Sequence, residues 1–404
     1  MRLRLEWSPS KARGARLFAM SVAVAPRPPI DTWIVALALA AAGCGGASPA
    51  GADAGAGGQG REEPPAVDAN QAEAQPAATG GANGSGGATA GGGSGGAAAA
   101  DASSEVPGAL SPASGSGTWT DLAPLPGAPR SDGSGALING RLFVVGGQGA
   151  DGQDVEAYDP KTDTWEKHVM MPVALNHANV AGVGDKLYVM GGRDSAASLV
   201  YNPFAPPAER KWSRMAQIPG QRESASVGVI GDKIYLVGGA ISHTDPPRGD
   251  VFVYDPAADS WDTTHPPLPV GRTHAASAVI GGILYITAGR KFAERFTEPA
   301  GWLTSTYAYD PVARQWSQKK DAPTARSGCV GATIKGLLIV AGGEGAPGGG
   351  TFPEVEAYNP DADQWTTLAP MMHPRNGQAE AGIGDRLYTA GGTATNVTDV
   401  LSLP

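Results

Sequence analysis

The stretch KIYLVGG at residues 233–239 decides the fold, because close copies of it recur from residue 141 to residue 392. In each copy a short apolar run leads into a pair of small residues, and that pair is diglycine in every copy but one. The copies are RLFVVGG (141–147), KLYVMGG (186–192), KIYLVGG (233–239), ILYITAG (283–289), LLIVAGG (337–343) and RLYTAGG (386–392). Self-similarity at a period of this length is typical of repeat architectures.

Aromatic residues follow each run in a fixed order. Five units continue with Tyr-Asp-Pro or Tyr-Asn-Pro and then a tryptophan, seven residues after the tyrosine in four of them and 11 in the other. The tryptophans are Trp165, Trp212, Trp261, Trp316 and Trp365, and Trp119 precedes the first unit. Two-residue turns of Gly, Asp or Asn precede most apolar runs, as in hairpins. Each unit therefore predicts four short strands, with the tyrosine ending the third and the tryptophan in the fourth.

This pattern resembles the kelch repeat over residues 118–404. The resemblance implies an all-β fold, a β-propeller with one blade of four antiparallel strands per repeat around a central channel. The last unit has room for only one strand after its diglycine, at 397–401, and carries no tryptophan. Residues 119–122 form a fourth strand with no blade before it. We therefore expect six blades, with the ring closed by an N-terminal strand.

Residues 1–43 have the composition of an export leader. They are basic, and the apolar run TWIVALALAAAG at 32–43 is too short to cross a hydrocarbon core of about 30 Å. The run ends at Cys44 in a way that resembles the lipobox of bacterial lipoproteins, although Ala41 stands where that family prefers leucine. The resemblance implies lipidation of Cys44. The alternative is an ordinary cleaved signal followed by a free thiol.

Residues 44–117 are predicted to be a disordered tether. From residue 45 on they contain no aromatic residue and no lysine, and long Gly, Ala and Ser tracts dominate. Such a chain cannot bury enough apolar area to offset the entropy of ordering, and its reach is roughly 45 Å. We expect a lipid-anchored protein of the bacterial cell envelope, at the outer membrane or cell surface. A secreted or periplasmic protein is the alternative.

The amino-acid composition argues against several classes of protein. The formal net charge of −9 gives no general attraction to nucleic acid. Two cysteines cannot supply a disulfide scaffold, a four-thiolate zinc site or an iron–sulfur cluster. We predict no metal and no cofactor. Radical-copper oxidases resembling galactose oxidase are disfavoured, because Cys329 alone is available in the repeats and the ring has six blades.

When the repeats are aligned, one position stands just before the first strand of each repeat, and its six residues form what we call the arginine column. Its members are Arg130, Leu175, Arg222, Arg272, Arg326 and Arg375. The first strand of a propeller blade is innermost, so we expect these arginines around the channel mouth as candidate ligand-binding residues, since guanidinium groups bind anions bidentately. The alternative is that they pair with acids or loop carbonyls between blades.

Other candidates lie on the same face. His177 and His274 stand two residues after the arginine column; we expect them apart across the channel, and include His274 in the ligand-binding set. Trp302 joins that set, because Phe292, Phe296 and Trp302 form either an exposed aromatic rim or a loop plug. Glu380 is the candidate for general acid–base catalysis.

Three functions follow from these features. The first is a binding module that presents a protein, peptide or glycan site on its loop-rich face, because variable loops on a rigid scaffold usually carry binding. The second is an isomerase: sialic acid mutarotases are exported kelch propellers, and a mouth of arginines with Glu380 suits an acidic sugar. The third is an envelope scaffold without a soluble ligand.

Overall fold

The computed structural model describes residues 112–149, 152–291, 301–346, 349–393 and 395–404. The chain divides into two compact units, and all of these residues belong to the second, Ala97–Pro404. Cys44, Phe292, Phe296 and the leader lie outside the described residues.

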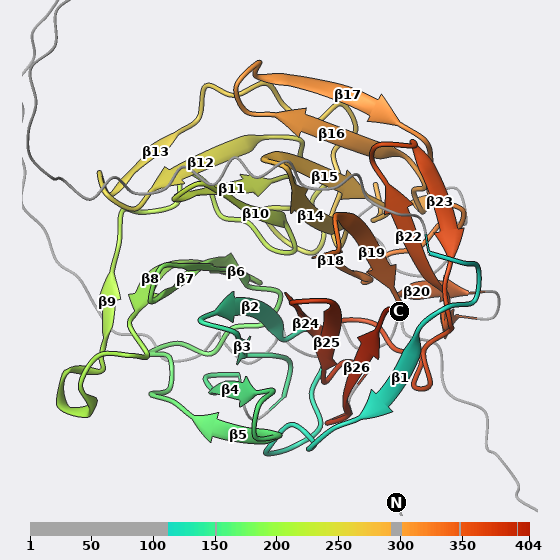
Figure 1. Ribbon diagram of the computed structural model, residues 1–404. Coiled ribbons are helices and arrows are strands. Elements are labelled where there is room, and N and C mark those ends of the chain that lie inside the picture. The colour runs from blue at the N-terminus through green and yellow to red at the C-terminus, as the bar shows by residue number, and fades with distance from the viewer. Residues whose placement is uncertain (1–111, 150–151, 292–300, 347–348, 394) are drawn as a thin grey trace, which may run out of the picture. The chain divides into compact units, whose positions relative to one another are not determined.

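Six four-stranded antiparallel sheets form the blades, and Figure 1 shows them arranged in a ring. Blade 1 comprises β2 (Ser134–Ile138), β3 (Arg141–Val145), β4 (Val155–Asp159) and β5 (Thr164–Lys167). Blade 2 comprises β6 (Asn179–Val183), β7 (Lys186–Gly192), β8 (Ser195–Tyr201) and β9 (Trp212–Arg214). Blade 3 comprises β10 (Ser226–Ile230), β11 (Lys233–Val237), β12 (Val251–Asp255) and β13 (Ser260–Asp262).

The second half of the ring has the same order. Blade 4 comprises β14 (Ala276–Ile280), β15 (Ile283–Thr287), β16 (Thr306–Asp310) and β17 (Gln315–Lys319). Blade 5 comprises β18 (Val330–Ile334), β19 (Leu337–Ala341), β22 (Val355–Asn359) and β23 (Gln364–Thr367), and its long loop holds a hairpin of β20 (Glu344–Ala346) and β21 (Gly350–Thr351). Blade 6 comprises β24 (Ala379–Ile383), β25 (Arg386–Ala390), β26 (Thr398–Ser402) and β1 (Thr118–Asp121). The predicted all-β fold with six blades is confirmed.

The ring is closed by its own N-terminus. Strand β1 pairs antiparallel with β26, so Trp119 faces Leu401 at the position where Trp165 faces Tyr158 in blade 1. The two ends of the described chain thus share one sheet (Figure 1). The contact extends slightly before residue 118, because Gly115 N donates to Thr367 O at 2.8 Å.

The fourth-strand tryptophans join neighbouring blades. Each indole Nε1 donates to a backbone carbonyl in the loop of the preceding blade, for example Trp165 to Ala123 O at 2.8 Å and Trp261 to Ala216 O at 3.0 Å. Trp119 does the same across the closure, to Ala369 O at 3.2 Å. A buried indole N–H needs such an acceptor, so the repeated tryptophan fixes the outer edge of each blade against its neighbour.

The hydrophobic core consists of layers between blades rather than one central cluster. Phe143 and Val145 of blade 1 pack with Leu187 and Val189 of blade 2 in one such layer. Toward the axis some neighbouring inner strands approach each other too closely for a side chain at the contact point. A Cβ on Gly135 would lie 2.2 Å from Glu380 O. The small residues of the first strands therefore let six blades meet around a narrow channel.

Candidate functional site at the channel

A cavity of about 460 Å³ occupies the channel and is lined by the inner strands of all six blades. Along each inner strand, residues that are partly accessible from the channel alternate with buried ones. In blade 1, for example, Gly135 and Leu137 are solvent-accessible whereas Ala136 is buried. This period of two is that of a β-strand, and it sorts the wall into successive layers along the axis.

A closed ring of backbone hydrogen bonds surrounds the channel where the inner strands begin. Its members are Asp132, His177, Ser224, His274, Gly328 and Gly377. Each backbone N–H donates to the carbonyl of the equivalent residue in the preceding blade, at 2.7–3.1 Å, and the last bond returns from Asp132 to Gly377. All six residues have a positive φ, between 53° and 64°. That conformation turns the chain from the incoming loop into the inner strand, so both the ring and the channel mouth are fixed by backbone geometry.

Four side chains of this ring gather at the mouth. The imidazole centroids of His177 and His274 are 5.0 Å apart, with an edge-to-face geometry. Ser224 Oγ and His274 Nε2 lie 3.1 Å apart, and His177 Nε2 lies 3.4 Å from Asp132 Oδ1. The expectation that the two histidines lie apart across the channel is wrong. Blades 2 and 4 are separated only by blade 3, and its ring residue, Ser224, is small enough for the imidazoles to meet.

Charged residues from the loops extend this cluster across the mouth. Arg290 Nη1 donates to Glu344 Oε1 at 2.8 Å, and Asn376 Nδ2 donates to Glu344 Oε2 at 2.9 Å. Arg290 Nη2 also lies 3.3 Å from His274 Nε2. On the other side Arg193 Nη2 lies 3.4 Å from His177 Nε2. Together with the four ring side chains these residues form what we call the mouth cluster, which connects blades 1 to 6 on the loop face.

The arginine column lies inside the blades rather than around the mouth, contrary to the sequence prediction. The five arginines are 0–4% exposed, and none of them lines the cavity. Arg375 shows the reason: its guanidinium forms a bidentate pair with Asp399 at 2.6 and 2.9 Å. Arg326 likewise donates to Glu356 at 2.7 Å. These side chains point outward from the axis, where they tie the incoming loop to the third strand of the same blade.

One residue of the third strand lies against the arginine-column residue of the same blade: it stands two positions before the repeat tyrosine in blades 1 to 5 and two positions before Leu401 in blade 6. Where that residue is acidic, the arginine forms an ion pair, as Arg130 does with Glu156. Where it is aromatic, the guanidinium lies over the ring: Arg272 is 5.4 Å from the centroid of Tyr307. The remaining pairs are Arg222 with Phe252, Arg326 with Glu356, Arg375 with Asp399, and Leu175 with Leu199 in one apolar cluster. Arg222 also forms an ion pair with Asp250. A comparison of these two columns in the sequence would have revealed the pairing.

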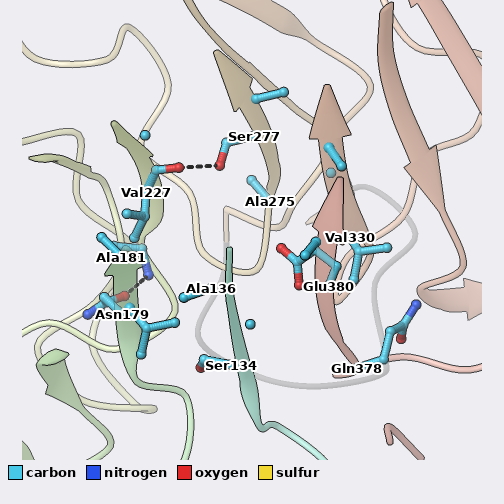
Figure 2. A pocket seen from close by; sticks show the side chains of 18 of the residues that line it. Ser134, Ala136, Asn179, Ala181, Val227, Ala275, Ser277, Val330, Gln378 and Glu380 are labelled. Carbon is cyan, nitrogen blue, oxygen red and sulfur yellow. Dashed lines mark hydrogen bonds between the residues drawn. The ribbon is translucent and has the colours of Figure 1, made fainter. Parts of the chain in front are cut away.

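Glu380 lies in β24, three residues deeper in the channel than Gly377 of the ring. Figure 2 shows its carboxylate directed into the cavity, with Val227 on another wall. Burial in the channel wall raises the pKa of this carboxyl to about 8, and no charged neighbour contributes to the shift. Glu380 is therefore largely protonated at neutral pH, and titrates just above it.

Trp302 and Cys329 are partly or wholly enclosed. Trp302 is half-buried and bridges to the backbone of Arg290, and a Cβ added to Gly345 of β20 would lie 2.5 Å from its ring. The indole thus covers the hairpin of blade 5, as in the loop-plug alternative. Cys329 is buried, and burial raises the pKa of its thiol to about 11.

The described residues lack two further features. Within the described ranges no group of three or more His, Cys, Asp or Glu side chains is placed to hold a metal ion. No helix in the same ranges has the length and apolar character needed to span a membrane.

Comparison with known proteins decides the family. Residues 176–392, more than half of the chain, match the KLHDC2/KLHL20/DRC7 Kelch-repeats domain, and residues 129–167 match the Kelch motif. The chain belongs to the kelch-repeat family. The kelch match begins at Asn176, directly before His177 of the ring, and ends at the last diglycine, so it covers blades 2 to 5 and the inner half of blade 6.

Two curated relatives match different lengths of the chain. Kelch-like protein terF of Aspergillus terreus is 32% identical over 292 residues, which is 63% of this chain and 62% of that protein. N-acetylneuraminate epimerase of Escherichia coli K12 is 40% identical over 84 residues, 18% of this chain and 22% of the enzyme. The kelch chain thus spans less than two thirds of the length of these relatives. Among solved structures, one titled "Structure of YjhT" has a TM-score of 0.58 at 18% identity, covering 69% of this chain and 95% of that one, and shares the fold.

Proposed function

We propose that this kelch protein is a cell-envelope-anchored binding module that presents its loop face to a protein, peptide or glycan. The observation that carries the proposal is the construction of that face. A mouth cluster assembled from all six blades stands on a closed backbone ring, and the longest loops of the repeats connect the second and third strands of the adjacent blades 3, 4 and 5. A rigid base with variable loops is the arrangement by which scaffolds usually bind partners.

The chemistry of this face favours polar recognition. The loop of blade 3 exposes His243 and Arg248, and the hairpin of blade 5 contributes Glu344 to the mouth cluster. The face therefore carries both positive and negative groups, and a partner would be held by hydrogen bonds and charge pairs. Interfaces of peptides and glycans with rigid loops are commonly polar and hydrated in this way.

The test is binding of the full-length protein to peptide and glycan arrays, followed by affinity measurement on any ligand found. The double variant His243→Ala, Arg248→Ala removes two exposed loop groups and should weaken binding at least tenfold. Lys186→Ala removes an exposed charge from the opposite face and is the matched control. Equal losses in both variants, or a ligand unaffected by the loop variant, would reject the loop face as the site.

Anchoring in the envelope is the second part of the proposal. It rests on the leader at 1–43, the Cys44 motif and the Gly/Ala/Ser-rich residues that follow. In a native bacterial host, Cys44→Ser should move the protein from the membrane fraction to the soluble fraction, whereas Cys329→Ser should leave it in the membrane. Membrane retention of the Cys44 variant contradicts lipidation.

An isomerase acting on an acidic sugar is the second candidate, favoured by the 84 residues that are 40% identical to N-acetylneuraminate epimerase. In this reading Glu380 exchanges the proton, since a group that titrates near pH 8 can both donate and accept. Anomer exchange of N-acetylneuraminate followed by NMR is the test. Acceleration abolished by Glu380→Gln would support the enzyme, and a rate equal to buffer would remove it.

A further inference from the structure

The positions that line the cavity below the mouth cluster form three layers along the axis. The first layer follows the ring, and the third lies beside the short turns at the other end of the inner strands. The middle layer contains Gly135, Val180, Val227, Ser277, Gly331 and Glu380. The third contains Leu137, Gly182, Val229, Val279, Thr333 and Gly382. In these two layers of the described wall Glu380 is the ionisable side chain, and most others are apolar or glycine.

Glu380 has an environment that calls for a cationic partner. The carboxylate faces the cavity (Figure 2), and no described side chain forms an ion pair with it. Leaving a carboxylate ionised in an apolar wall is costly unless an opposite charge compensates it. Blade 3 stands opposite blade 6 in the ring, and Figure 2 shows Val227 across the cavity from Glu380. Val229 also lines the cavity.

The two ends of the cavity differ in access. At the loop face the ring of backbone hydrogen bonds and the side chains of Asp132, His177 and His274 narrow the mouth. At the other end the connections are two-residue turns, and Leu137 is 43% exposed at the rim. A small ligand would therefore enter between the turns and meet apolar side chains before it reached Glu380.

We propose that the channel is a second binding site, separate from the loop face, for a small molecule that carries a protonated amine on an apolar body. The ammonium group pairs with the Glu380 carboxylate, while the body packs against Val227, Val229 and Leu137. The volume of about 460 Å³ lies in the range of small-molecule sites. A divalent metal fits less well, because a single carboxylate supplies few of the oxygen ligands that such ions need.

Binding of an amine at this site should depend on pH, because binding is coupled to the ionisation of Glu380. Glu380 must lose its proton before it can pair with an ammonium group, and the pKa of its carboxyl is raised to about 8 by burial. The inner strands β2 and β18 beside it carry no titratable side chain. The other titratable groups of the described wall are Asp132, His177, His274 and Cys329, and on the outer side β25 contributes Arg386 and Tyr388.

The experiment uses the full-length protein with cyclohexylamine as the probe, and with cyclohexanol and cyclohexanecarboxylate as isosteric comparisons. Binding is measured by calorimetry and by saturation-transfer NMR between pH 6 and 9. We expect the amine to bind and the carboxylate not to bind. Amine affinity should rise about tenfold per pH unit below pH 8, following the ionised fraction of Glu380.

Variants separate this site from the loop-face site. Glu380→Gln should weaken amine binding at least tenfold and remove its pH dependence, whereas Asp385→Asn, which removes an exposed carboxylate from a turn of the same blade, should change neither. Val229→Phe narrows the cavity and should weaken the amine and the alcohol alike. His243→Ala, Arg248→Ala should leave amine binding intact. The proposal is overturned if no amine binds, if the carboxylate binds equally well, or if Glu380→Gln binds like the wild type.

Discussion

The two ends of the channel are formed by the same six inner strands, yet they are chemically opposite. At the loop end, six residues with a positive φ close a ring of backbone hydrogen bonds. His177, His274 and Asp132 belong to this ring and carry polar side chains. At the turn end, the strands finish in short turns, and the wall is apolar from Leu137 to Val279. The comparison teaches that one propeller channel can be polar at one end and apolar at the other. The residue types at successive positions of the inner strands vary independently of one another.

Deleting β1, Thr118–Asp121, is expected to have the largest effect on both ends. Without it β26 has an unpaired edge, and the Trp119 hydrogen bond to Ala369 O is lost. We expect a loss of several kcal/mol in the free energy of unfolding. Thermal and urea denaturation would measure it. Deleting four residues from 86–96 is the control, and an equal melting temperature for the two deletions would refute closure by β1.

The buried pair behind the loop end should have the next largest effect. Arg375→Leu leaves Asp399 buried without its partner and should cost about 3–5 kcal/mol in unfolding free energy. Adding Asp399→Leu imitates the Leu175–Leu199 arrangement of blade 2 and should recover most of that loss. Urea denaturation of both variants decides the point. If the double variant were no more stable than the single one, the pairing of the two columns would be incorrect.

A pair of glycines with the same φ tests the comparison of the two ends directly. Gly377 in the ring and Gly384 in a turn both have a φ of 63°. A Cβ at Gly377 would lie 2.5 Å from Asp132 Oδ1, whereas nothing lies within 4 Å of a Cβ at Gly384. Gly384→Ala should therefore cost about 1 kcal/mol from backbone strain, and Gly377→Ala about 1–2 kcal/mol more. Equal costs in chemical denaturation would show that the ring is not tightly packed.

Glu380 should affect stability by an amount that depends on pH and vanishes in acid. Its pKa is raised on folding to about 8, so the folded state binds more protons than the unfolded state, and stability falls as pH rises from about 4.5 to 8. Glu380→Gln removes this loss. We expect the variant to be more stable than the wild type by about 1–3 kcal/mol at pH 9 and equal to it near pH 4. A pH-independent difference would mean that Glu380 is well solvated.

Much of the fold could be predicted because its signals are local. Strand ends and turns are marked by the diglycine after each apolar run and by the tyrosine and tryptophan that follow. The last repeat has no tryptophan, which indicated that the segment around Trp119 supplies the closing strand. The direction of the arginine side chains could not be predicted in the same way. Their partners, such as Asp399 for Arg375, lie 24 residues away on another strand, and strand order alone does not say which way a side chain turns.

The channel shows which features of this protein could be predicted from the sequence and which required the three-dimensional structure. The sequence by itself determined the repeat, the six blades, the closure and the column in which each residue stands, because all of these depend on periodicity and short-range turn chemistry. Only the tertiary structure decided that His177 and His274 meet, that the arginines turn away from the axis, and that Glu380 faces an apolar wall. Those relations depend on how six separate strands converge around one axis, and convergence is a property of packing between blades rather than of any one repeat.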